Sequence, residues 1–214
     1  MKNNISPQDY WESRFKDIDP ETYDFSESKP AATLAHFCDK YLKEGDTVLD
    51  VACGGGRNAH YLAQRGYTVY GIDFAKSAIE FCKKRFVRFN LSGTFKQGTM
   101  DNLAFPNDFF AGVMCMAAID HVTTDCARRV LGEIRRVLVP GKAILLTFDH
   151  PKQDEDIIHL AEVLVDGTFK YIHGEYVGML FRRYTDEEIE LLIGKQNIIS
   201  FDHTEEGARV IICK

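Results

Sequence analysis

A short apolar strand that leads directly into three glycines constrains this chain more than any other feature. The strand covers residues 47–51, and Gly54, Gly55 and Gly56 follow it closely. A β-branched and aliphatic run bounded by turn residues is typical of a buried strand in a parallel sheet. Glycines at its end predict a tight turn into a helix, so we expect helices packed against a sheet.

Strand and helix patterns alternate through most of the chain. The expected strands cover residues 47–51, 68–72, 94–97, 112–117 and 143–148. The expected helices cover residues 57–65, 75–88 and 124–138. This alternation predicts an α/β fold: a doubly wound, mostly parallel sheet with right-handed crossovers and helices on both faces.

The C-terminal third follows a different pattern. Pro140-Gly141 predicts a turn, and a capping box beginning at Thr185 opens a helix that reaches residue 193. Residues 198–203 and 209–213 pattern as an antiparallel hairpin. Residues 151–184 break the alternation and are rich in His, Tyr and Arg, so we interpret them as an insertion over the strand ends.

Composition narrows the class of protein. With 214 residues and 45% hydrophobic content, the chain can bury one large core, and we expect a single domain over residues 1–214. The longest apolar stretch, 109–119, is shorter than the roughly 18 residues of a membrane span. The polar first ten residues lack a signal peptide, so we expect a cytoplasmic protein with no membrane partner.

Charge and cysteine spacing bear on possible partners. The formal net charge of −6 argues against a nucleic-acid binder, because phosphate neutralisation needs a basic surface. The six cysteines are scattered, and no Cys/His cluster has metal-ligand spacing. We therefore expect the cysteines to be small core residues and expect no metal.

The glycine loop and a second acid together predict a binding site for an adenosine group. The loop reads D-x-A-x-G-x-G from Asp50 to Gly56, and Asp73 ends the second expected strand. Ligands of open α/β sheets bind beyond the carboxyl ends of the strands, where a carboxylate can accept hydrogen bonds from both ribose hydroxyls. The helix after the loop also offers free N–H groups. The structural alternative is a tight turn with a helix cap.

The segment V-L-D-V-A-C-G-G-G-R-N-A-H-Y-L-A, residues 48–63, resembles motif I of class I S-adenosylmethionine-dependent methyltransferases. Residues 65–74, 98–122 and 137–147 resemble later motifs of that family. The stretch G-R-N-A-x-Y-L-A, with Tyr10-Trp11-Glu12, looks most like its small-molecule branch, which includes the tellurite-resistance and thiopurine methyltransferases. The resemblance covers residues 10–214. It implies a Rossmann-like, seven-stranded sheet completed by the C-terminal hairpin, with S-adenosyl-L-methionine as cofactor and S-adenosyl-L-homocysteine as product.

The resemblance also implies roles for residues at the strand ends. The glycine loop would line the methionine half of the cofactor, Asp73 would hold the ribose and Phe74 would pack on adenine. Thr99 stands where the family has an acid for the adenine amino group, which leaves that contact open. The expected cofactor-binding residues are Trp11, Arg14, Asp50, Ala52, Cys53, Gly54, Gly56, Asp73, Phe74, Thr99, Met100, Cys115, Met116 and Ala117.

Methyl transfer from a sulfonium depends mainly on orientation and desolvation, and it needs a base only for a protonated nucleophile. We name His121, with Asp120, as catalytic candidates, either as a base or as a substrate contact; the alternative is a histidine hydrogen-bonded at a helix start. Residues 1–40, through Trp11, are expected to form a lid. The expected substrate contacts are His150, Tyr176, Arg182 and Arg183.

These inferences favour a methyltransferase that transfers a methyl group to a small-molecule acceptor by in-line displacement. A tRNA or protein methyltransferase is the alternative enzyme, although it would favour a more basic surface. A non-catalytic S-adenosylmethionine-binding regulatory module is a third hypothesis, which the departures at Ala52 and Thr99 leave open. The D-x-A-x-G-x-G order disfavours a nicotinamide oxidoreductase.

Overall fold

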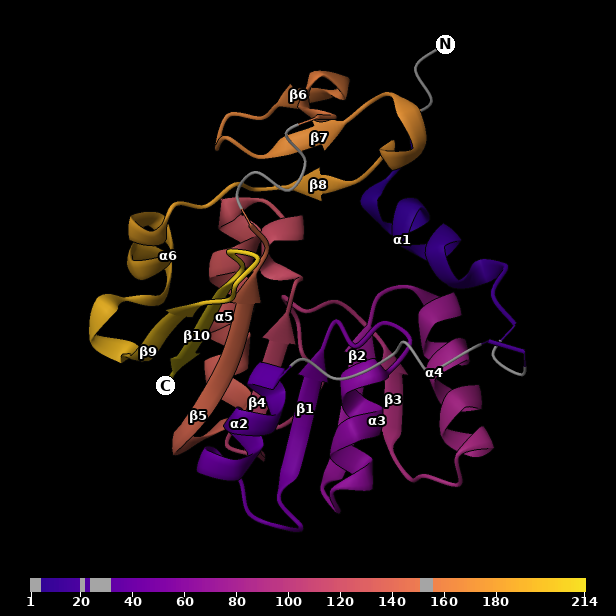
Figure 1. Ribbon diagram of the computed structural model, residues 1–214, viewed down its shortest axis with the longest axis vertical. Helices are drawn as coiled ribbons and strands as arrows, with labels where there is room; N and C mark the ends of the chain where they lie inside the picture. The colour runs from indigo at the N-terminus through magenta and orange to yellow at the C-terminus, as the bar shows by residue number, and fades with distance from the viewer. Residues whose placement is uncertain (1–4, 20–21, 24–31, 151–155) are drawn as a thin grey trace.

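The main sheet has seven strands in the order β3-β2-β1-β4-β5-β10-β9 (Figure 1). The computed structural model describes residues 5–19, 22–23, 32–150 and 156–214. The strands are β1 Thr47–Val51, β2 Thr68–Asp73, β3 Thr94–Gln97, β4 Phe110–Met116, β5 Leu138–Phe148, β9 Ile198–His203 and β10 Arg209–Cys213. Neighbours among β1–β5 pair in parallel, whereas β10 is antiparallel to both β5 and β9. The predicted mostly parallel sheet with an antiparallel C-terminal hairpin is confirmed.

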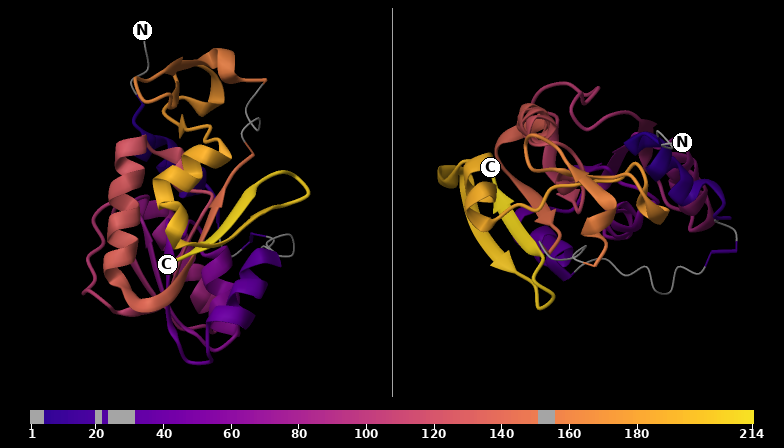
Figure 2. Two further views of the ribbon diagram at one scale, coloured as in Figure 1. Left: turned by 90° about the vertical axis from the view of Figure 1, so that its left-hand side faces the viewer. Right: turned by 90° about the horizontal axis from the view of Figure 1, so that it is seen from above.

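Helices cover both faces of this sheet (Figure 2). They are α2 Ala32–Tyr41, α3 Arg57–Gln64, α4 Lys76–Arg88, α5 Thr124–Val137 and α6 Asp186–Ile193. Side chains of adjacent strand residues point to opposite faces, so Val48 packs with α2, α3 and α4 while Leu49 packs with α5 and α6. The predicted two-sided arrangement of helices is therefore also confirmed. None of the described helices is both long and apolar enough to cross a membrane.

A second, smaller sheet lies over the carboxyl ends of the parallel strands (Figure 1). Its antiparallel strands are β6 Ala161–Val163, β7 Phe169–Tyr171 and β8 Leu180–Phe181, and we call it the cap sheet. Helix α1, Pro7–Lys16, lies beside it and buries Tyr10 against Tyr171 and Phe181. The cap sheet occupies most of the insertion inferred for 151–184, of which residues 151–155 lie outside the described part of the chain.

The prediction that Pro140-Gly141 forms a turn before the fifth strand is wrong. Strand β5 begins at Leu138 and continues through both residues. The register against β4 shifts between the pairs Phe110–Leu138 and Gly112–Ala143, and Gly141 adopts a φ of +82°. The extra residues are therefore absorbed as an irregularity within a continuous strand, as in a β-bulge.

The capping box predicted at Thr185 is present at the start of α6. The Thr185 hydroxyl accepts the backbone N–H of Glu188 at 3.2 Å, and the Glu188 carboxylate accepts that of Thr185 at 2.8 Å. This local sequence signature therefore sets the helix start.

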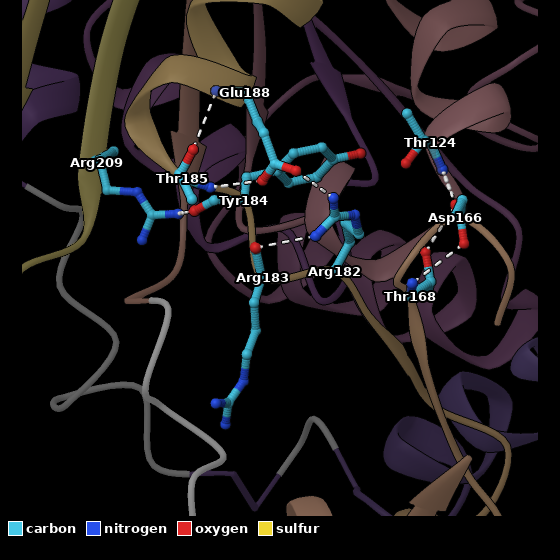
Figure 3. A network of polar contacts seen from close by, with 9 residues as sticks. All are labelled: Thr124, Asp166, Thr168, Arg182, Arg183, Tyr184, Thr185, Glu188 and Arg209. Atoms are coloured by element: carbon cyan, nitrogen blue, oxygen red, sulfur yellow. Dashed lines mark hydrogen bonds and ion pairs between the residues drawn. The ribbon is translucent and has the colours of Figure 1, made fainter. Parts of the chain in front are cut away.

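One aspartate next to the cap sheet caps a helix that packs on the main sheet (Figure 3). Asp166, in the turn between β6 and β7, accepts the backbone N–H of Thr124 at 2.6 Å, at the first residue of α5. It also accepts the backbone N–H of Thr168 at 3.1 Å and its hydroxyl at 2.9 Å. Burial tends to raise the pKa of Asp166, but these donors outweigh it and lower the pKa to about 2. The cap sheet is thereby tied to the start of α5.

We predict that Asp166→Ala lowers the free energy of unfolding by about 1 kcal/mol at neutral pH, the usual cost of losing a helix cap. The matched control is Asp125→Ala, which removes an exposed acid in the same first turn of α5. Because the folded pKa of Asp166 is depressed, its contribution is present above the ordinary value of 3.8 and is lost as the pH falls toward 2. Urea denaturation at several pH values measures both effects. Equal losses in the two variants, or a gap that widens in acid, would contradict the prediction.

Candidate functional site

A cavity of about 400 Å³ opens at the carboxyl ends of β1, β2 and β4, beneath α1 and the cap sheet. This size falls within the range of small-molecule sites, roughly 300–1,000 Å³. Many residues expected to bind a cofactor or act in catalysis line it: Trp11, Ala52, Gly54, Asp73, Phe74, Thr99, Met100, Ala117 and His121. The fold thus brings together residues as far apart in the chain as Trp11 and His121.

The glycine loop forms one wall of the cavity with its backbone. Gly54 and Gly56 have φ values of +51° and +74°, in the region that favours glycine. A Cβ at Gly56 would lie 2.3 Å from the sulfur of Cys82 on α4, so a side chain there would require that sulfur to move. Ala52 also adopts a left-handed φ of +57°, which an L-residue reaches only at a steric cost.

Asp73 joins the two loops that border the cavity. One carboxylate oxygen accepts the backbone N–H of Gly54 at 2.9 Å, and the other accepts that of Ala75 at 2.9 Å. The side chain is buried, which raises the pKa of Asp73, while the two N–H donors oppose that rise. Each oxygen retains a second lone pair, so the carboxylate can still accept hydrogen bonds from a ligand.

The remaining expected cofactor residues do not line the cavity. Asp50 is only 2% exposed, and burial raises its pKa to about 7. One of its carboxylate oxygens is buried with no hydrogen-bond partner among the described residues. The residues placed outside the lining are Arg14, Asp50, Cys53, Gly56, Cys115 and Met116. Their contacts with a cofactor stay predictions.

Helix α1 covers the cavity and docks on α4. The Glu12 carboxylate accepts the backbone N–H of Ser77 at 3.1 and 3.3 Å, and the Ser77 hydroxyl donates to the Glu12 carbonyl at 2.8 Å. Trp11 and Phe15 then face the cavity, one helical turn apart. This placement agrees with the lid expected for residues 1–40, of which residues 1–4, 20–21 and 24–31 lie outside the described structure.

His121 is held between the cap sheet and β5. Its Nδ1 lies 2.9 Å from the carbonyl oxygen of Leu180, which requires a proton on Nδ1. Its Nε2 lies 3.7 Å from a carboxylate oxygen of Asp149, and its ring meets that of Trp11 edge to face at 5.1 Å. Asp120 lies behind it, 1% exposed, and accepts the backbone N–H of Asp149 at 2.7 Å.

The charges of this group depend on one another. Burial alone lowers the pKa of His121, but the contact with Asp149 and the charge of Asp120 outweigh it and raise the pKa to about 9. Burial raises the pKa of Asp120 to about 6, against the opposing charge of His121. Potential ligand atoms of these three residues lie within 4.8 Å of one another, but a protonated His121 has no nitrogen lone pair to offer a metal ion. The absence of a metal stays an expectation.

The expected substrate residues lie on the rim and in the cap sheet, outside the cavity lining. The Arg182 guanidinium contacts the Glu188 carboxylate at 2.5 Å and donates to the Arg183 carbonyl at 3.0 Å (Figure 3). Arg183 points away from Arg182 and lies over the ring of Phe169 at 5.5 Å. Tyr176 packs near Tyr171.

His150 is the last of the expected substrate residues. Its ring lies against Gly207 in the turn between β9 and β10. The substrate roles of His150, Tyr176, Arg182 and Arg183 stay predictions.

Several residues that line the cavity were not expected from the sequence: Pro7, Phe15, Ile72, Gly98, Asp101, Ala118, Val122, Thr123, Cys126 and Leu180. Phe15 lies four positions after Trp11, so helical spacing could have identified it. Cys126 is only half buried, whereas the other five cysteines are buried as expected. Asp101 follows Thr99 closely in the same loop, but nothing local marks its side chain as facing a ligand.

Residues 48–141 match the family model described as a methyltransferase domain. Over 111 residues the chain is 34% identical to a ubiquinone biosynthesis O-methyltransferase of Alkalilimnicola ehrlichii, covering 51% of this chain and 44% of that protein. Over 114 residues it is 37% identical to a fatty-acid O-methyltransferase of Mycolicibacterium smegmatis, covering 52% and 40%. The chain thus spans less than half the length of either relative.

Solved structures share the whole fold. A Pyrococcus horikoshii protein superposes with a TM-score of 0.75 at 20% identity, covering 94% of this chain and 98% of that one. A SAM-dependent methyltransferase from Methanosarcina mazei superposes with a TM-score of 0.70 at 23% identity, covering 86% and 97%. The fold is therefore the Rossmann-like fold of such methyltransferases. The match to a methyltransferase domain over residues 48–141 agrees with the family that the sequence resembles.

We predict that His121 remains protonated well above neutral pH, with a pKa of about 9. Asp149→Asn should lower that pKa, because the favourable contact with the carboxylate is lost. The matched control is Asp186→Asn, which removes the carboxylate that pairs with His203 on the surface. Imidazole NMR titration, assigned with His121→Gln, measures the values. A His121 that titrates near 6.5 in the unmodified protein would refute the described geometry.

Proposed function

We propose that this chain is an S-adenosylmethionine-dependent methyltransferase that acts on a small-molecule acceptor. The observation that carries the proposal is the cavity itself. It combines the glycine loop and Asp73 on one side with the apolar side chains of Trp11 and Leu180 on the other. One side can hold the adenosyl and methionine groups, and the other can receive an acceptor of modest size.

The residues present fit S-adenosylmethionine. Gly54 brings backbone rather than a side chain to the cavity, and Asp73 has free lone pairs for two ribose hydroxyls. The buried, unpaired oxygen of Asp50 offers an acceptor beneath the loop for the methionine amino end. When bound, the cofactor would supply a methyl group on a cationic sulfur: the acceptor atom would bond to the methyl carbon from the side opposite the sulfur, and the sulfur would leave as the neutral thioether of S-adenosylhomocysteine.

The chain's own contribution is orientation and exclusion of water. Asp73 fixes the ribose, and Phe74 packs on the base. Trp11, Val122 and Leu180 cover the cavity, and a covered site strengthens the electrostatic interactions inside it. His121 lines the acceptor side, and Asp120 beneath it helps to maintain its charge. Because the leaving group is neutral, orientation and exclusion of water are the main requirements, and a base is needed only when the acceptor atom carries a proton.

The acceptor is proposed to be a small molecule rather than tRNA or protein. The net charge of −6 and the mostly apolar lining of the cavity support this. Relatives named for ubiquinone biosynthesis and for fatty-acid O-methylation support it as well. Resemblance of Tyr10-Trp11-Glu12 to the tellurite-resistance and thiopurine branch points to the same general acceptor class.

We also propose that α1, the cap sheet and the main sheet form one domain. Tyr10 of α1 is buried against the cap sheet, and Asp166 of the cap sheet caps α5. Glu12 of α1 in turn bonds to the start of α4. These contacts link the three parts around the cavity.

Calorimetric titration with S-adenosylmethionine, S-adenosylhomocysteine and NAD tests the cofactor. We expect the first two to bind at one site and NAD not to bind. Transfer of a labelled methyl group to pooled small molecules, bulk tRNA and bulk protein then tests the acceptor. If neither S-adenosylmethionine nor S-adenosylhomocysteine binds, the proposal is refuted. If they bind but no methyl group is transferred to any of the three pools, the result favours a non-catalytic S-adenosylmethionine-binding regulatory module.

Asp73→Ala is predicted to weaken S-adenosylhomocysteine binding more than tenfold, since charge-assisted hydrogen bonds contribute about 1.5–3 kcal/mol each. Asp39→Ala is the control, because it removes a surface carboxylate that pairs with Arg65. Calorimetry gives the affinities, and circular dichroism checks folding. An affinity unchanged in the Asp73 variant would mean that the ribose lies elsewhere.

A further inference from the structure

A buried arginine of the C-terminal hairpin joins two segments that border the cavity. Arg209 begins β10 and is the register partner of Phe148, the last residue of β5. Its side chain is only 2% exposed. Its Nη1 donates to the carbonyl oxygen of Asp149. Its Nη2 donates to the carbonyl oxygen of Tyr184 at 2.8 Å (Figure 3). Arg209 therefore connects the loop after β5 to the segment that leaves the cap sheet.

These two segments are the ones that hold His121. The carbonyl oxygen of Leu180 lies 2.9 Å from Nδ1 of His121, and the carboxylate of Asp149 lies 3.7 Å from Nε2. Only three residues separate Leu180 from Tyr184, so fixing the carbonyl of Tyr184 also limits where Leu180 can lie. Arg209 thus holds the backbone beside both partners of the imidazole ring.

Asp120 joins the same two segments by a second route. Its carbonyl oxygen accepts the backbone N–H of Arg182 at 2.6 Å. Its carboxylate accepts the backbone N–H of Asp149 at 2.7 Å. Asp120 directly precedes His121 in the chain, so these bonds fix the backbone of the histidine, whereas the bonds of Arg209 fix the groups that its ring meets.

We propose that Arg209 is a positioning residue for His121, because it holds Asp149 and the chain after Leu180 where they orient the imidazole at the wall of the cavity. Arg209 lies outside the cavity lining, so it acts on His121 only through these partners. The inference rests on the proposed function for its catalytic meaning, since His121 lines the acceptor side. Methyl transfer depends on orientation, and a misplacement of about 1 Å can lower a rate by about 100-fold.

The guanidinium group suits this task. It presents several N–H donors in a rigid planar fork, so one side chain can bond two carbonyl oxygens at a fixed angle. Burial lowers the pKa of Arg209, and the charge of Asp186, whose carboxylate lies 3.7 Å from Nε, is the main influence that opposes this. The buried cation is therefore retained beside acids and carbonyl oxygens, as a buried charge requires.

Position and charge predict opposite changes at His121 when Arg209 is replaced. A positive charge disfavours a second cation nearby, so removal of that charge alone would raise the pKa of His121. Burial lowers the pKa of His121, and the contact with Asp149 is the main influence that nevertheless raises it to about 9. If Arg209 positions Asp149, its removal weakens this contact and lowers the pKa of His121.

The test is imidazole NMR titration of His121 in Arg209→Met. We expect its pKa to fall from about 9 toward the ordinary 6.5, and its Nδ1–H resonance to exchange faster with solvent as the bond to Leu180 loosens. Thermal unfolding verifies that the variant is folded. Arg209→Gln, which is also neutral but keeps a side-chain amide, replaces it under the same criteria if Arg209→Met does not fold.

Val210→Ala is the matched control for a general loosening of β10. It removes buried apolar volume at the next residue of the strand and leaves the bonds of Arg209 in place. Its His121 should titrate and exchange as in the unmodified protein. The proposal is overturned if the pKa of His121 rises or stays unchanged in the Arg209 variant, or if Val210→Ala lowers it equally.

Calorimetry with S-adenosylhomocysteine separates this inference from the proposed function. Affinity in the Arg209 variant should stay within about twofold, because Asp73 and the glycine loop lie elsewhere on the cavity wall. A larger loss than in Val210→Ala would mean that Arg209 supports the cofactor side, which overturns the positioning role. If the unmodified protein does not bind the compound, the proposed function is wrong, while the NMR titration still decides whether Arg209 positions His121.

Discussion

The carboxylate of Asp73 is the interaction on which the candidate site depends. It ends β2 and accepts one N–H from the glycine loop and another from the start of α4. A buried carboxylate is costly unless donors satisfy it, and these two N–H groups do so only when both loops take their observed shapes. The positive φ values at Gly54 and Gly56 and the close approach of α4 to the loop belong to the same arrangement. Parallel strands place all of these elements at one edge of the sheet.

The side of the cavity opposite Asp73 is held by a different kind of contact. It comes from α1 and the cap sheet, and among the described residues no strand of the main sheet pairs with either of them. A few polar contacts between distant residues tie them down, such as Glu12 with Ser77 and Asp166 with Thr124. Burial of Tyr10 and Phe181 adds apolar stabilisation.

Elements with a local cause were predictable. The strands, the glycine loop and the Thr185 capping box follow from periodicity and from side chains three or fewer positions apart. Pro140-Gly141 is an equally local pattern that predicts a turn, but in the structure these residues lie within β5, which pairs with β4 and β10. Arg182 carried a plausible substrate signal, yet its guanidinium is bonded to Glu188 and to the Arg183 carbonyl. Asp101 gave no signal, because its partner Arg129 belongs to α5, far along the chain.

By itself, the sequence determined the α/β sheet, the position of the glycine loop and the acid at the end of β2. Each of these depends on residues close together in the chain, and the spacing of those residues limits the backbone conformations that the segment can adopt. Only the tertiary structure decided which side chains share the cavity: Trp11 and Phe15 from α1, His121 between Leu180 and Asp149, and Asp101 beside Thr99. Those neighbours are set by long-range packing and by the need to satisfy buried polar groups, and neither can be read from one stretch of chain.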